Sequence, residues 1–189
     1  NSSLTFLDCS KSMLSNLDVS QNIALMCLWC GQNNLLTLDV SQNDSLEHLF
    51  CYNNQITNLD LSQNTILSSL NCSNNQLTSL DVSTSTDLTY LDFDDNQLAN
   101  IDLSQNANLA TLIASFNQLT SLDVSNNTAL TTLKCNFNQL TSLDVSVNTA
   151  LTYLDFHDNQ LANIDLIQNV DLVTLRAGIN QLTSLDLDN

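Results

Sequence analysis

Leucines recur along this chain with an invariant period. Leu4 and the eight leucines that follow at steps of 21 residues form one column, and a second column runs three positions later, from Leu7 to Leu175. Nine periods of 21 residues account for all 189 residues. A fixed period of this length is the signature of a solenoid, in which each unit buries its apolar face against its neighbours. The pattern therefore predicts one repeat domain over 1–189, with no internal linker.

Each unit consists of two related halves, as in LTTLKCNFNQ and LTSLDVSVNTA at 130–150. In the first half Leu133 and Cys135 alternate with polar residues, and in the second half Leu143 and Val145 do the same. This alternation is typical of a half-buried strand, and no segment has helical periodicity. The sequence predicts nine 21-residue coils stacked as a right-handed parallel β-solenoid, each coil with two short strands and little or no helix.

Asparagines occupy the two predicted turns of nearly every unit. A side-chain amide both donates and accepts hydrogen bonds, so we expect stacked asparagines to satisfy the backbone of the turns and one another. These residues are interpreted as structural. The central members of the first column are Asn54, Asn75, Asn96, Asn117 and Asn138.

An aspartate column runs through the second half of all nine units. Carboxylates about 5 Å apart repel one another, so hydrogen bonds from neighbouring Ser, Thr, Asn or backbone N–H groups, or bound cations, must offset the repulsion. The uniformity of the column favours a structural role, with weak Ca²⁺ binding as the alternative. Its central members are Asp81, Asp102, Asp123 and Asp144.

Five of the six cysteines share one column with apolar residues. Phe93 and Phe156 take the same position in other units, so the column is predicted to point into the core, where free Cys behaves as a small apolar residue. Disulfides between neighbouring coils are the alternative, although an in-register ladder suits packing better than bridging. The five residues are Cys9, Cys30, Cys51, Cys72 and Cys135.

The unit LxxLxCxxNQLxxLDVSxN resembles a bacterial leucine-rich repeat, and more narrowly the 21-residue class with nested halves found in internalins and surface antigens. All nine units carry the pattern. The resemblance implies a leucine-rich repeat solenoid that serves as a binding scaffold, located outside the cell or on its surface for adhesion. The chain starts and stops within the repeat without polar capping units, so we expect it to be a segment of a longer protein.

Composition excludes several other functions. Twenty acidic residues against three basic ones give a formal net charge of −17, which repels the phosphates of nucleic acids. No apolar run approaches the roughly 20 residues of a membrane-spanning helix. Two glycines leave no phosphate-binding loop, and no Ser/His/Asp set is recognisable. We therefore expect neither an enzyme nor a bound cofactor.

Units differ strongly from one another only at the outward positions of the first predicted strand. Exposed aromatic residues gather there on the first three units, and such patches usually mark interaction sites. The alternative is that a preceding unit covers them. We take a protein or a surface glycan as the partner of this face. The candidate partner-binding residues are Phe6, Trp29, His48, Phe50, Tyr52, Tyr90, Asp92, Asp94, Tyr153 and Asp155.

A rival hypothesis is an ordered surface such as ice or a mineral, matched by the regular Ser, Thr, Asn and Asp ladders. The aspartate column argues against ice, because ionised carboxylates hold their own hydration shell. Thermal hysteresis in a freezing assay separates this hypothesis from protein binding.

Two stretches, 88–103 and 151–166, differ at a single position and contain paired carboxylates that a divalent cation could use. Duplication of a three-unit block explains their likeness without a metal site. No metal is therefore predicted, and the weak candidates are Asp92, Asp94, Asp155 and Asp158.

Overall fold

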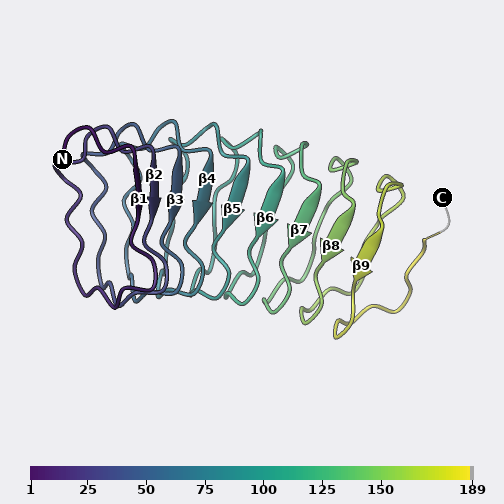
Figure 1. The fold of residues 1–189 in the computed structure, drawn as a ribbon. Helices are drawn as coiled ribbons and strands as arrows, with labels where there is room; N and C mark the ends of the chain where they lie inside the picture. Colours follow the sequence, from purple (N-terminus) through teal and green to yellow (C-terminus); the bar gives the residue numbers. More distant parts are fainter. Residues whose placement is uncertain (188–189) are drawn as a thin grey trace.

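The computed structural model describes residues 1–187 and shows a solenoid built on one parallel β-sheet. The nine strands lie in sequence order, and each residue pairs with the residue 21 positions later. Figure 1 shows the coils stacked side by side from the N-terminal to the C-terminal end. The predicted 21-residue coil is confirmed. The strands are β1 (Phe6–Asp8), β2 (Cys27–Trp29), β3 (His48–Phe50), β4 (Ser69–Asn71), β5 (Tyr90–Asp92), β6 (Thr111–Ile113), β7 (Thr132–Lys134), β8 (Tyr153–Asp155) and β9 (Thr174–Arg176).

The leucine columns form a continuous core. Leu88 and Leu91 are fully buried, as are their counterparts in the other inner coils. The cysteine column also points inward, because Cys72, Phe93 and Cys135 have no exposed surface. Inner leucines of the first and last coils are only partly buried, since each is covered from one side.

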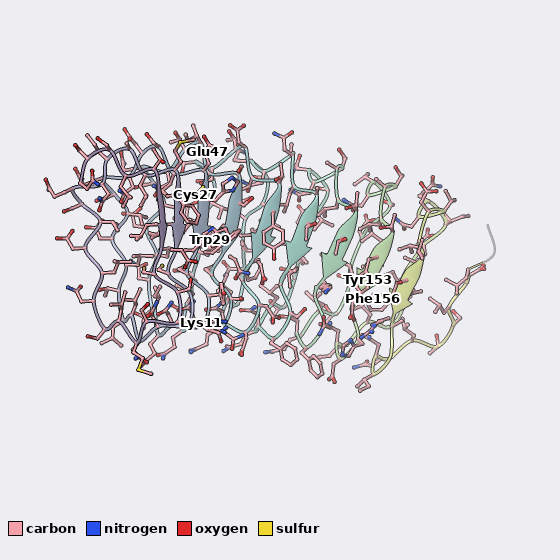
Figure 2. All side chains as sticks on the ribbon, viewed as in Figure 1. Lys11, Cys27, Trp29, Glu47, Tyr153 and Phe156 are labelled. Atoms are coloured by element: carbon pink, nitrogen blue, oxygen red, sulfur yellow. The ribbon has the colours of Figure 1, made fainter. Side chains whose placement is uncertain are left out.

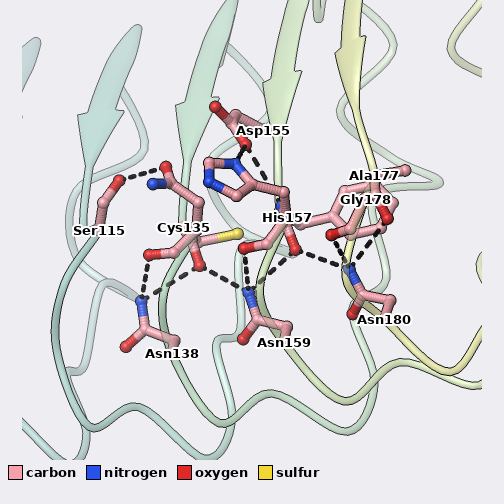
Figure 3. Close-up of polar contacts among 11 residues, drawn as sticks. Ser115, Cys135, Asn138, Asp155, His157, Asn159, Ala177, Gly178 and Asn180 are labelled. Carbon is pink, nitrogen blue, oxygen red and sulfur yellow. Dashed lines mark hydrogen bonds and ion pairs between the residues drawn. The ribbon is translucent and has the colours of Figure 1, made fainter.

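The first asparagine column joins each coil to the preceding one. The amide nitrogen of Asn96 donates to the carbonyl of Phe93 in its own coil (3.0 Å) and to that of Cys72 in the preceding coil (3.1 Å). Its Oδ1 accepts from the N–H of Leu77 (2.9 Å). Figure 3 shows the repeated donor contacts of Asn138 and its successors. The predicted hydrogen bonds to the turn backbone are present. Within residues 1–187 no hydrogen bond joins the stacked amides of this column to one another, so that part of the prediction is wrong.

The second predicted strand does not form in the described coils. Leu80 and Val82 point inward as the alternation predicts, but the sheet contains only the first strand of each coil. Side chains form hydrogen bonds with the backbone N–H and carbonyl groups that a second sheet would need. Asp81 accepts from the N–H of Ser83, and Asn106 of the next coil donates to the carbonyl of Val82. Such local side-chain bonds compete with a strand ladder.

All six cysteines are free thiols, and four of them are fully buried. Burial raises the pKa of the Cys51 and Cys135 thiols and suppresses the reactive thiolate. We predict that the native protein exposes at most Cys9 and Cys27 to a thiol reagent such as Ellman's reagent at mildly alkaline pH.

In concentrated guanidinium chloride without reductant, the same titration should count six thiols. A denatured count near two or zero would show that neighbouring coils are bridged by disulfides and would contradict the buried thiol ladder.

Candidate functional site

Aromatic side chains line the outward face of β1 to β3. Trp29 stacks on Phe50 with ring centroids 5.8 Å apart and planes 23° apart, and Phe6 meets Trp29 edge to face at 5.1 Å. Phe6 is 47% exposed and Trp29 is 38% exposed. Figure 2 shows Trp29 over the N-terminal strands of the sheet. We call Phe6, Trp29, Phe50 and Tyr52 the N-terminal aromatic patch.

Tyr52 occupies space that only a glycine leaves free. A Cβ atom at Gly31 would lie 2.6 Å from the Tyr52 ring, so the missing side chain lets the tyrosine lie back over the preceding coil. His48 is half-buried on β3, in register with Cys27 and Ser69, in the column beside the patch.

The two outward aspartates further along the sheet are not available to a partner. Asp92 is 8% exposed and Asp155 is 3% exposed, so these two candidate partner-binding residues are buried although they take outward strand positions. Neighbouring side chains cover them, and strand alternation alone does not report this shielding.

Asp92 is the centre of a hydrogen-bonded cluster on β4 and β5. Its Oδ2 accepts from the amide of Asn71 (3.0 Å) and the hydroxyl of Tyr90 (3.2 Å), and its Oδ1 accepts from the N–H of Asp94 (3.1 Å). Burial raises the pKa of the Asp92 carboxyl. Burial and the nearby Asp92 charge raise the pKa of Tyr90 to about 12.

The matching cluster on β8 has a histidine where the first has Asp94. Nδ1 of His157 lies 2.6 Å from Oδ1 of Asp155, as Figure 3 shows. Tyr153 is half-buried beside it, with the ammonium group of Lys134 5.2 Å from its ring centroid. The two similar stretches, 88–103 and 151–166, therefore differ at one residue after the strand, Asp94 in the first and His157 in the second. Asp94 bonds to Asp92 through its backbone N–H, whereas His157 also contacts Asp155 through its ring.

No group of three or more His, Cys, Asp or Glu side chains within residues 1–187 is arranged to hold a metal ion. Asp92 and Asp94 are linked through a backbone N–H, and Asp158 follows His157 in the turn after β8. Within residues 1–187 these carboxylates do not come together with a third ligand around one point where a metal ion could bind.

The exposed aspartate column is stabilised by local backbone bonds. Oδ1 of Asp102 accepts from the N–H of Ser104, and Asp144 accepts from Ser146, each at 2.9 Å. These backbone bonds lower the pKa of both carboxyls, while neighbouring aspartates act in the opposite direction. Hydrogen bonds of the predicted kind are therefore present along the column, and its structural role stays a prediction.

Sequence reasoning missed a second exposed aromatic pair, Phe116 and Phe137. They lie in the turns after β6 and β7, 46% and 37% exposed, and stack with ring centroids 4.2 Å apart. The signal was present in the sequence, because phenylalanine replaces the polar residue that precedes the ladder asparagine in most other units.

Solved structures with this fold include leucine-rich repeat proteins from bacteria. The functional domain of InlJ from Listeria monocytogenes, which includes a cysteine ladder, is 43% identical over 98% of this chain, with a TM-score of 0.97. InlF from the same species is 24% identical over 94% (TM-score 0.85), and the leucine-rich effector YopM from Yersinia pestis is 25% identical over 87% (TM-score 0.74). This chain covers 42%, 54% and 46% of those three chains, or about half their length.

No protein-family model and no curated protein matches the sequence. The repeat, the inward columns and the structural matches together define a leucine-rich repeat solenoid. Within that class, the chain is similar to the repeat domain of InlJ from Listeria monocytogenes. No helix in the described part of the chain is long and apolar enough to cross a membrane.

Asp94 makes stability depend on pH. Burial, followed by the charges of Asp92 and Asp95, raises its pKa to about 6. The folded chain therefore favours the protonated carboxyl over the ionised one. The stability that Asp94 contributes is complete below its unfolded pKa of 3.8 and is lost as pH rises through about 6. We predict that Asp94→Asn raises the melting temperature at neutral pH and changes it little near pH 4.

The matched control is Asp87→Asn, which removes one exposed carboxylate that precedes β5 and should shift the melting temperature less at neutral pH. If both variants show the same pH dependence of melting, general charge repulsion accounts for the effect and the Asp94 environment does not.

Proposed function

We propose that this chain is a non-enzymatic protein-binding module and that its partner docks on the N-terminal aromatic patch. The observation that carries the proposal is the contact series Phe6–Trp29–Phe50 on the outward face of β1 to β3. Exposed aromatic clusters of this kind are the usual centre of a protein interface. The likeness to internalin-like repeats supports a binding scaffold in general.

The geometry of the patch favours a protein over a glycan. Its rings meet both edge to face (74°) and nearly parallel (23°), so they form an uneven surface that side chains of a partner can enter. Each ring is held by its neighbours, and Tyr52 is held over Gly31, so little side-chain freedom is lost on binding.

The position of the patch favours a partner over a preceding repeat unit. A unit stacked before β1 would extend the sheet along the solenoid axis and meet the edge of the first coil. Trp29 and Phe50 lie on the second and third strands and point away from the sheet, so such a unit would leave much of their surface open.

Charge adds a preference for basic partners. The chain carries a net charge of −17, and Asp8 on β1 is exposed in register with Trp29. A basic rim on the partner would speed association and strengthen the contact. The resemblance to internalins supports action outside the cell or at its surface, whereas the ice or mineral hypothesis gains no support from these neighbours.

Trp29 is the single tryptophan of the chain, so its fluorescence reports on this surface alone. A panel of purified receptor ectodomains and surface glycans can be titrated against the protein and followed by the emission of Trp29. We predict that a protein partner shifts the emission to the blue. Trp29→Ala with Phe50→Ala should weaken its Kd by about 30-fold or more, as measured by calorimetry, because hot-spot truncations cost at least about 2 kcal/mol.

Leu36→Ala is the matched control, because Leu36 is an exposed apolar residue in the same coil outside the strand. It should leave the Kd unchanged. A protein partner that binds the folded double variant as tightly as the parent chain would contradict the proposal. A blue shift of the Trp29 emission with glycans only would show that the ligand of this patch is a carbohydrate and not a protein.

A further inference from the structure

The turn that follows each strand forms a regular row along one edge of the sheet. In this row one residue per coil has a positive φ, and the row begins at Lys11, at the lower edge of the sheet in Figure 2. Parallel backbone bonds continue through it: the N–H of Phe116 donates to Asn136 (3.0 Å) and that of Phe137 donates to His157 (3.0 Å). Successive members are therefore separated by the strand spacing of about 4.8 Å. The row contains Lys11, Gln32, Asn53, Asn74, Asp95, Phe116, Phe137, Asp158 and Ile179.

Phenylalanine is a poor choice for this backbone conformation. Phe116 has φ of 50° and Phe137 has φ of 53°, in the left-handed region that Asn and Asp tolerate far better than bulky residues. Asn53 and Asn74 hold the same position in earlier coils. Phe116 is 46% exposed and Phe137 is 37% exposed, so neither ring is buried in the core and burial does not compensate for the unfavourable backbone. Strained residues of this kind gather where the side chain serves a binding function.

The two rings form a preorganised apolar platform with carboxylates at both ends. Their planes are 16° apart with centroids 4.2 Å apart, and His157 packs edge-on against Phe137 at 4.7 Å. Asp155 holds that imidazole from the other side.

The carboxylates belong to the flanking coils of the same row. Asp95 precedes the phenylalanine pair and is exposed, and Asp158 follows it and is half-buried. Neither carboxylate forms a salt bridge to Lys, Arg or His within residues 1–187.

We propose that Asp95, Phe116, Phe137 and Asp158 bind an extended protein segment of the pattern Arg-x-apolar-x-Arg. Three coil steps place the row positions of the two aspartates about 14 Å apart, and residues i and i+4 of an extended chain lie about 13 Å apart. Side chains i, i+2 and i+4 share one face, so two arginines reach the carboxylates while the apolar residue covers the rings.

Arginine fits both parts of this surface. Its guanidinium pairs with a carboxylate and also stacks on an aromatic face, which a lysine does less well. The net charge of −17 disfavours an acidic segment at the same place. The surface lies at the turn edge of coils five to eight, apart from the N-terminal aromatic patch on the strand face of the first three, and it stands independently of the function proposed there.

The test uses the whole chain, labelled with ¹⁵N, and the peptide Ac-Ser-Arg-Ser-Leu-Ser-Arg-Ser-NH₂ as the probe. We expect saturable shifts of the backbone amides of Phe116, Asn117, Phe137 and Asn138. Replacing both arginines by glutamate, or placing them side by side in the peptide, should abolish or strongly weaken the shifts.

The matched variant is Phe116→Asn with Phe137→Asn, which gives the row the residue it already has at Asn53 and Asn74. Because Asn suits the left-handed backbone, this variant should melt at or above the temperature of the parent chain. It should bind the peptide at least about tenfold more weakly. Leu36→Asn, at an exposed apolar site outside the row, should bind as the parent does.

Two results would overturn the proposal. Equal binding by the folded Phe116→Asn/Phe137→Asn variant would show that the peptide is held only by the overall negative charge. The absence of saturable binding to the parent chain would show that this row is not a site for such a segment.

Discussion

The structure depends on one repeated interaction, the side-chain amide of an asparagine that is shared between two coils. Asn117 donates to carbonyls of its own coil and to Phe93 of the preceding coil, and it accepts from the N–H of Leu98. A coil alone buries little, so the leucine core exists only when coils lie in register. The amide enforces that register because its partners come from two coils. In the second asparagine column, Asn106 also donates to the preceding coil, but its Oδ1 is buried and accepts no hydrogen bond from the described protein.

This constraint divides the surface into fixed and free positions. The leucine, asparagine and aspartate columns maintain the coil, so their residues vary little between units. The outward strand positions and the residue with positive φ in the following turn do not maintain the coil, and their residues vary. Both surfaces proposed for binding use the free positions. Trp29 stands where four other coils have Asp or Asn, and Phe116 also stands where four other coils have one of these two residues. Function in this molecule is therefore expected where the repeat is broken.

Periodicity predicted most of the fold, because every inward column is a property of a single unit repeated in register. The inward direction of Cys72 and Phe93 followed from apolar residues that share one column. Features that depend on neighbouring side chains were not predictable in this way. Asp92 is buried beneath Asn71 and Tyr90, which both donate hydrogen bonds to it. Within residues 1–187 the second strand does not form, because side chains bond to its backbone groups. The unfavourable backbone conformation of the exposed residue Phe116 was not predictable either, because only the structure shows that this residue has a positive φ.

Amide hydrogen exchange of residues 119 and 122 tests the central role of the asparagine column most directly. Leu119 and Leu122 are both buried leucines of one coil, but the N–H of Leu119 donates to Asn138 (2.9 Å) while that of Leu122 makes no hydrogen bond within the described chain. The account predicts strong protection of the Leu119 amide, much weaker protection of the Leu122 amide, and loss of the difference in Asn138→Ala. Equal protection of the two amides in the parent chain would contradict it.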